Sequence, residues 1–301
     1  MNTRGAPGGD WRFDVLRSVL ESLLPGIDVE LRQRCRSTNS ELMDRLRQAD
    51  GGGVPGAASR READMRPCLL VAVEQTAGRG RLGRVWRSVP GDSLTFTLAL
   101  PLAASDWSGL SLAVGAALAD AIEPLRAGVA PRLGLKWPND LWLLDPMPGA
   151  DAAAVAGRKL GGILIETVQR GDARWAVIGV GLNVAAPQGL TSDDAAYGVA
   201  GVREIDPAAT APALLARVAP ALVQAVQCFE REGFAGFRIA YASRDVLAGR
   251  PVRTTQEGMP EGVARGIAPD GGLLVETGRG LATVRSGDVS VRLRAPEAGD
   301  A

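Results

Sequence analysis

The spacing of apolar residues divides the chain into helix-like and strand-like stretches. Apolar side chains three and four positions apart are typical of a helix that buries one face, whereas short continuous apolar runs are typical of buried strands. By this criterion four stretches are predicted to be helical, namely residues 11–24, 107–122, 211–232 and 236–241. A further helix is predicted after Ser37-Thr38-Asn39, because Thr38 and Glu41 have the spacing of a capping box.

Strand-like runs occupy the middle of the chain, and shorter ones occupy its end. Residues 69–73, 94–100, 159–166 and 175–184 are predicted strands. Glycines inside the last two of these runs indicate that another group approaches the backbone closely. From Arg250 onward, short strands alternate with turns rich in Gly, Pro and Asp, which predicts a small antiparallel barrel of about fifty residues.

One loop between two predicted strands concentrates positive charge on a flexible backbone. The stretch from Gly78 to Trp86, GRGRLGRVW, alternates three glycines with Arg79, Arg81 and Arg84. Arginine presents donors suited to phosphate and carboxylate oxygens, so the stretch predicts an anion-binding loop. Two alternatives are a dinucleotide loop, since the glycines spell G-x-G-x-x-G, and a basic loop that only faces solvent. A strand-like run after Trp86, where a dinucleotide loop needs a helix, disfavours the first alternative.

Composition narrows the possible chemistry. The 301 residues carry a formal net charge of +0 and 46% hydrophobic residues, which is typical of a soluble protein with no global field toward nucleic acid. The chain has no histidine, which excludes imidazole bases and imidazole zinc sites. Its three cysteines show no paired spacing, the N-terminus lacks the apolar core of a signal peptide, and the apolar region 110–122 is too short to span a bilayer. These features predict a cytoplasmic protein.

Lysine is the rarest charged residue, and both lysines lie in motif-like segments. Only Lys136 and Lys159 stand among 34 basic residues. Lys136 begins the stretch Lys136-Trp137-Pro138-Asn139-Asp140-Leu141, in which Pro138 interrupts any strand ladder. We therefore expect Lys136, Asn139 and Asp140 on a turn at strand ends, where sites commonly lie. A turn with a chance charge pair is the alternative.

Five segments, taken in order, resemble the biotin–protein ligases. They are Ser37-Thr38-Asn39, Gln75 with Gly78 to Trp86, Lys136 to Leu141, Lys159 to Glu166 and Gly179 to Val184. The resemblance implies an α+β fold: a mixed-sheet catalytic domain of the biotin/lipoate-ligase type followed by a small C-terminal SH3-like β-barrel. The expected divisions are an N-terminal helix and extension at 1–28, the catalytic domain at 29–246, the barrel at 247–296 and a tail at 297–301.

The resemblance also implies an activity. Biotin and ATP, with Mg²⁺, give biotinyl-5'-AMP and pyrophosphate, and a lysine of the biotin carboxyl carrier protein then takes the biotinyl group and releases AMP. A carboxylate that attacks a phosphate needs cations around both groups. By the resemblance, Lys159 and Arg81 are the expected catalytic cations. Asp140 is expected to orient or deprotonate the carrier lysine. The Mg²⁺ ligands are not identified.

The resemblance assigns further binding residues. The biotin side is expected to comprise Ser37, Thr38, Asn39, Gln75, Gly78, Arg79, Arg81, Lys159, Gly162, Leu164, Gly179 and Gly181. The ATP or adenylate side is expected to comprise Arg81, Arg84, Trp86, Lys136, Trp137, Asn139, Asn183 and Arg292. The arginine loop and residues 185–202 are expected to close over the adenylate, and ligand is expected to order the arginine loop.

Several family properties differ or stay open. Some members carry a DNA-binding winged helix before the catalytic domain, whereas only 36 residues precede Ser37 here. We therefore expect a monofunctional ligase that does not bind DNA or membranes, as a monomer or weak homodimer. The loops at 49–67 and 146–157 look longer than usual. Lipoate–protein ligase and a non-catalytic biotin- or nucleotide-sensing protein are the alternatives.

Overall fold

The computed structural model describes residues 10–48, 66–145, 157–187, 198–257, 261–285 and 291–293. The loops at 49–67 and 146–157 and the centre of the expected lid at 185–202 therefore lie almost wholly outside the described residues, as does the expected tail.

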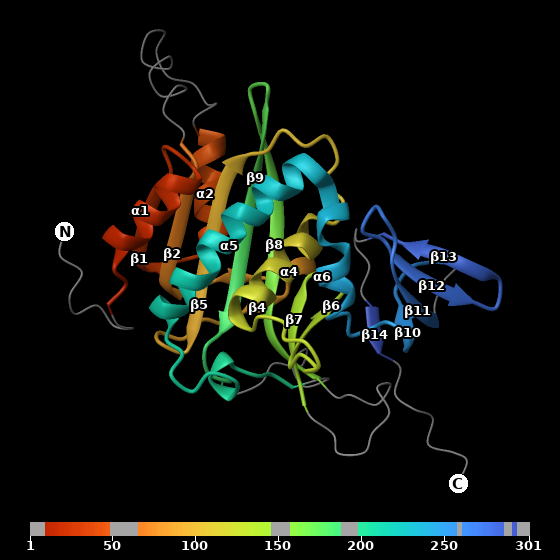
Figure 1. Cartoon of the computed structure of the whole chain (residues 1–301). Coiled ribbons are helices and arrows are strands. Elements are labelled where there is room, and N and C mark those ends of the chain that lie inside the picture. Colours follow the sequence, from red (N-terminus) through yellow and green to blue (C-terminus); the bar gives the residue numbers. More distant parts are fainter. Residues whose placement is uncertain are drawn as a thin grey trace.

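A seven-stranded mixed sheet forms the larger part of the molecule (Figure 1). Its strands follow the order β1-β2-β5-β9-β8-β7-β6. The β1–β2 pair is parallel and the other pairs are antiparallel, which confirms the predicted mixed sheet. The strands are β1 (Asp28–Cys35), β2 (Cys68–Gln75), β5 (Ser93–Pro101), β6 (Leu133–Lys136), β7 (Asp140–Leu144), β8 (Gly157–Arg170) and β9 (Ala173–Asn183).

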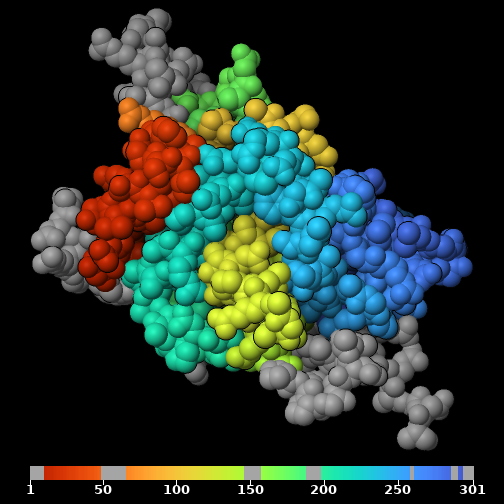
Figure 2. Space-filling model, in the orientation of Figure 1, coloured from red at the N-terminus to blue at the C-terminus, as the bar shows by residue number. Residues whose placement is uncertain are grey.

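Helices cover the two faces of this sheet unequally. Helices α1 (Phe13–Leu23), α4 (Leu110–Ile122) and α5 (Ala211–Glu232) pack on one face and share its apolar core. Figure 2 shows this helical face, with α1 in red and α5 in cyan. On the other face α2 (Thr38–Gln48) buries a second, smaller core against the sheet. The helical stretch 211–242 is long and apolar enough to cross a membrane by composition, but it packs as a core helix, with 56% of its most apolar window buried.

Strand alternation explains why a site forms beside α2. Positions of β5 and β9 that face α1, α4 and α5 are large and apolar, such as Phe96, Leu98 and Ile178. The intervening positions face the other way and are small: Thr97 pairs with Gly179, and Thr95 pairs with Gly181. In β8, Gly162 lies opposite Gly181. Because successive strand residues point to opposite faces, these small residues leave a hollow on the α2 side of the sheet.

The start of α2 differs from the predicted capping box. Ser37, not Thr38, precedes the first helical residue, and its Oγ accepts a hydrogen bond from the Ser40 backbone N–H at 3.4 Å. Glu41 instead forms ion pairs with Arg32 and Arg45. The prediction that Thr38 and Glu41 form the capping box is therefore wrong. The Thr38 hydroxyl instead forms hydrogen bonds with Gln75 and Thr97 of the sheet.

The C-terminal strands form a separate five-stranded antiparallel sheet in the order β13-β12-β11-β10-β14. This confirms the predicted small β unit, which lies beside α6 (Arg238–Ala242) and β6 in Figure 1. Its buried side chains continue the main core, so the two sheets form one packed body. The strands are β10 (Pro251–Thr254), β11 (Glu261–Ile267), β12 (Leu273–Thr277), β13 (Gly280–Val284) and β14 (Val291–Leu293).

Candidate active site

A cavity of about 500 Å³ opens on the α2 side of the large sheet. Its walls come from the start of α2, the arginine loop, the turn between β6 and β7, strands β8 and β9, and β14 of the small sheet. The arginine loop, residues Gly78 to Trp86, consists of two short paired strands, β3 (Gly78–Arg79) and β4 (Val85–Trp86), joined by a single 3-10 turn. Segments that are far apart in sequence therefore meet around one hollow.

On one side of the cavity, polar side chains form hydrogen bonds mostly with one another. Gln75 Oε1 accepts from the Thr38 backbone N–H at 2.7 Å and from the Thr38 hydroxyl at 3.2 Å. The Thr97 hydroxyl lies 2.7 Å from Thr38 Oγ1 and 2.6 Å from Asn39 Oδ1. Asn39 Nδ2 donates to the Leu164 carbonyl at 3.2 Å. Thr38, Thr97 and Asn39 are buried, so this side offers fixed polar groups at the floor of the hollow.

Glycines and one tryptophan shape the same side. A Cβ on Gly179 would clash with the Asn39 amide, and one on Gly181 would lie 2.5 Å from the Trp86 ring. The Trp86 ring therefore lies against β9, and its buried indole nitrogen has no hydrogen-bond partner among the described residues. Arg79 closes this side from the loop through an ion pair of 3.1 Å with Glu166 of β8.

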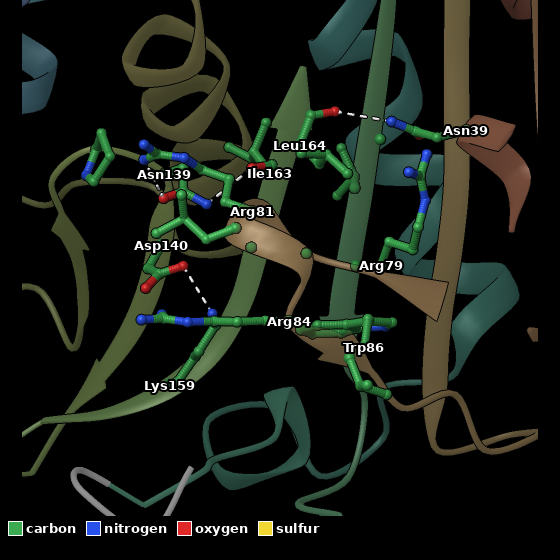
Figure 3. A pocket seen from close by; sticks show the side chains of 18 of the residues that line it. Asn39, Arg79, Arg81, Arg84, Trp86, Asn139, Asp140, Lys159, Ile163 and Leu164 are labelled. Carbon is green, nitrogen blue, oxygen red and sulfur yellow. Dashed lines mark hydrogen bonds and ion pairs between the residues drawn. The ribbon is translucent and has the colours of Figure 1, made fainter. Parts of the chain in front are cut away.

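The opposite side of the cavity is charged (Figure 3). Lys159 Nζ lies 2.9 Å from Asp140 Oδ1, and their side chains are 27% and 15% exposed. Burial alone would raise the pKa of Asp140, but the charges of Lys159 and Lys136 outweigh burial and lower it. Burial lowers the pKa of Lys136 to about 8, because the favourable charge of Asp140 is offset by Lys159, Arg84 and Arg292. Several cations therefore surround one carboxylate.

Arg81 is held across the cavity mouth by the turn. Its Nη1 donates to Asn139 Oδ1 at 3.2 Å, and Asn139 Nδ2 donates to the Ile163 carbonyl at 2.9 Å. The backbone of Asn139 also accepts from the Ile163 N–H at 2.9 Å. The turn is thus fastened to β8, and it aims Arg81 toward the same space as Lys159.

A second set of ion pairs lies directly beside Lys159. Arg158 Nη2 lies 2.7 Å from both Asp145 Oδ1 and Glu204 Oε2. The backbone of Lys159 meanwhile pairs with residues 198–200, since its N–H donates to Gly198 and its carbonyl accepts from Ala200. The described stem of the expected lid is therefore fixed against β8 next to the catalytic candidate.

Seventeen of the residues predicted for the site line this cavity. Three do not. Gly78 pairs with Trp86 in the short β3–β4 ladder, Trp137 is fully buried and donates from Nε1 to the Gly271 carbonyl at 3.0 Å, and Asn183 donates to the Ala200 carbonyl. These three therefore lie outside the cavity lining, and their role at a ligand stays a prediction. Trp86, predicted for the nucleotide side, lies against Gly181, a residue predicted for the biotin side.

Some cavity residues escaped the sequence reasoning. Thr97 ties Thr38 to Asn39, and its only signal was a hydroxyl inside an apolar run. Trp142 lines the cavity, and Phe96 borders it although its side chain packs in the apolar core on the helical face; periodicity predicts both positions as core. Val291 reaches it from the small sheet, which no local pattern indicates.

Comparison with known proteins agrees with this architecture. Residues 62–183 match the biotin/lipoate A/B protein ligase family, and residues 248–292 match the biotin protein ligase C-terminal domain. The fold and the site thus define an enzyme of the biotin/lipoate ligase class. The bifunctional ligase/repressor BirA of Salmonella typhimurium is 32% identical over 288 residues, which cover 93% of this chain and 78% of that protein. The chain belongs to the biotin protein ligase family.

Two further relatives bear on function and fold. The biotin–acetyl-CoA-carboxylase ligase of Mycobacterium tuberculosis is 32% identical over 264 residues, which cover 86% of each chain. The structure of biotin protein ligase from Aquifex aeolicus in complex with biotin and ATP superimposes with a TM-score of 0.66 at 24% identity, over 89% of this chain and 99% of that one. At that identity the structural likeness establishes the fold alone.

Proposed function

We propose that this protein is an ATP-dependent biotin ligase that joins biotin to a lysine of the biotin carboxyl carrier protein through biotinyl-5'-AMP. The observation that carries the proposal is one cavity with two unlike sides. A polar floor with glycine walls lies on one side, and the Lys159–Asp140 pair with four further cations lies on the other. Such a cavity suits a molecule with a small neutral ring system at one end and a carboxylate at the other, where the carboxylate must meet a phosphate.

We assign the biotin head group to the glycine-walled side. Thr38, Asn39 and Gln75 offer fixed hydrogen-bonding groups there. Gly179 and Gly181 let the Asn39 amide and the Trp86 ring lie directly against β9, where any Cβ would clash. The Trp86 ring supplies an apolar wall for the ring system, in place of its predicted contact with nucleotide. Ser37, Arg79 and Leu164 complete this side.

We assign the reacting groups to the charged side. The biotin carboxylate oxygen attacks the α-phosphorus of ATP, the bond to the β-phosphate oxygen breaks, and pyrophosphate leaves. Lys159 and Arg81 stand where the two anions must meet, so their charges lower the repulsion and stabilise the transition state. Arg84, Asn139 and Arg292 line the remaining adenylate side, and Lys136 lies beneath it.

In the second half-reaction the carrier lysine amine attacks the acyl carbonyl, and AMP leaves. An ordinary lysine is protonated at neutral pH, so the proton must be removed before attack. The lowered pKa of Asp140 and its contact with Lys159 suit it to orient the incoming ammonium group better than to act as a strong base. We therefore propose that Asp140 positions the carrier lysine.

Mg²⁺ enters this scheme as the ion bound to the ATP phosphates. In the described part of the chain no three carboxylates or thiols converge on a metal position, and the cavity carboxylate Asp140 is already paired with Lys159. This donor set does not fit a resident ion. When bound, Mg²⁺ supplies charge neutralisation on the phosphates, and the chain's own contribution is the set of cations named above.

Mass spectrometry of a carrier domain incubated with the protein, biotin and MgATP tests the proposal. We expect the mass of one biotinyl group on the carrier, with pyrophosphate release that needs both biotin and ATP. Preferential transfer of lipoate would instead support the lipoate alternative, which the match to a biotin-specific C-terminal domain disfavours. Binding of biotin without pyrophosphate release would indicate a sensing protein.

We further propose a monofunctional, cytoplasmic ligase that acts as a monomer or weak homodimer. Specific retardation of an operator-like duplex at physiological salt would refute the absence of DNA binding, and light scattering across a concentration series measures the oligomeric state.

A further inference from the structure

The turn between β6 and β7 contacts the small sheet as well as the cavity. Lys136, the last residue of β6, donates from Nζ to the Val291 carbonyl of β14 at 2.8 Å. The next residue, Trp137, donates from Nε1 to the Gly271 carbonyl at 3.0 Å. Two consecutive side chains of one motif thus bind backbone carbonyls of the other sheet.

Both side chains are removed from solvent at this junction. Trp137 is 0% exposed and Lys136 is 8% exposed. The small sheet also lies close to the start of α4, because a Cβ on Gly271 would lie 2.6 Å from the Cα of Gly109, which precedes that helix. A buried ammonium group without a hydrogen-bond acceptor costs free energy. The hydrogen bond from Lys136 therefore fixes where the Val291 carbonyl lies.

The position of the Val291 carbonyl matters because it influences the next residue, Arg292. Val291 and Arg292 are successive residues of β14, and both line the cavity. Strand β14 has three residues and pairs with β10, where Arg292 lies opposite Arg253. A strand this short has few ladder hydrogen bonds of its own, so an additional anchor on Val291 strongly restricts where Arg292 points.

We propose that Lys136 and Trp137 are positioning residues that dock the small sheet and thereby place Arg292 on the adenylate side of the cavity. This role replaces the direct nucleotide contact expected from their motif, and it rests on the proposed function, since it presumes that Arg292 meets the nucleotide. The motif from Lys136 to Asp140 then has two halves. The side chains of its first half bind the small sheet, although Lys136 also lines the cavity, and its second half, Asn139 and Asp140, faces the cavity.

The test compares Lys136→Met, Lys136→Arg and Arg292→Met with the double variant Lys136→Met/Arg292→Met. Measured quantities are KM for ATP in pyrophosphate release, biotin affinity without ATP, and hydrogen–deuterium exchange of the peptide that contains β14. We expect Lys136→Met to raise KM for ATP about tenfold, to speed exchange at β14 and to leave biotin affinity within about twofold, as loss of one charged hydrogen bond predicts. Lys136→Arg keeps a donor and should recover most of the KM.

The double variant separates positioning from direct contact. If Lys136 acts through Arg292, the double variant has nearly the KM of Arg292→Met alone. If the two substitutions instead raise KM for ATP by factors that multiply in the double variant, and the exchange at β14 is unchanged, the proposal is overturned in favour of direct nucleotide binding by Lys136. An unaltered KM in Lys136→Met would overturn it as well. Failure of the proposed function appears separately, as absence of biotin-dependent pyrophosphate release in the parent protein.

Discussion

Replacing Lys159 by methionine should separate catalysis from stability at the charged side of the cavity. The substitution keeps the length of the side chain and removes its charge, which leaves Asp140 without a cation at 2.9 Å. Loss of one preorganised charge at a developing anion costs about 3–4 kcal/mol of transition-state stabilisation, or roughly 10²- to 10³-fold in the rate of adenylate formation. Pyrophosphate release at saturating biotin and ATP measures that rate.

The same substitution has a cost in the unfolding free energy. Breaking a fully buried ion pair costs about 3–5 kcal/mol. Lys159 is 27% exposed and Lys136 still lies nearby, so we expect a smaller loss, about 1–3 kcal/mol, in urea unfolding. Removing the charge of Lys159 also removes a cause of the lowered pKa of Asp140, so protonation of the carboxyl limits the cost.

The double variant Lys159→Met/Asp140→Asn is the control for this reasoning. It removes both charges, so it should regain most of the lost stability while adenylate formation stays low. Recovery of activity together with stability would refute the catalytic role of Lys159, because the single variant would then have failed only through folding. A parent-like rate in Lys159→Met would refute it directly.

Three other substitutions test different parts of the site. Gly179→Ala should weaken biotin binding at least tenfold in calorimetry, since the new methyl group displaces the amide that lies against it. The folded pKa of Lys136, about 8 against an ordinary 10.5, means that the unfolded chain binds more protons between these pH values. The parent should therefore gain stability over Lys136→Met as pH rises from 8 to 10, by at most about 1.4 kcal/mol per unit in urea unfolding. Arg158→Gln should raise KM for ATP several-fold by releasing residues 198–201.

Matched controls exist for two of these substitutions. Gly278 has nothing within 4 Å of an added Cβ, so Gly278→Ala should leave biotin affinity unchanged. Arg265 forms an ion pair with Glu276 on the small sheet, so Arg265→Gln should leave KM for ATP unchanged. Equal effects in control and test variants would contradict the assigned roles. For Lys136, parallel stability curves for parent and variant between pH 8 and 10 would do so.

Periodicity predicted most of the strands and helices that bury a continuous face. It missed β1, an edge strand whose residues are mostly half-buried or exposed and so show no apolar run. It did not predict the hollow, since that depends on which strands lie side by side. Thr97 and Gly179 are distant in sequence and become partners only through the pairing of β5 with β9.

The motifs identified the region of the site better than the role of each residue in it. Asp140 and Trp137 belong to the same five-residue motif, yet one lines the cavity and the other lies in the core with its indole bound to Gly271. Sequence spacing alone cannot distinguish a ligand contact from its support, because both are fixed by the same turn. Likewise, Ser37 and Thr38 are equally good caps in sequence, and only the position of Gln75 draws Thr38 away.

The placement of both lysines in the cavity has a practical consequence for chemical labelling. The chain has no other lysine, and Lys159 is the more exposed of the two, with 27% of its side chain accessible. An amine-directed reagent therefore has only the cavity and the α-amino group to modify. Mass-spectrometric labelling of the intact protein should thus report cavity occupancy directly, with none of the background that surface lysines give in an ordinary enzyme.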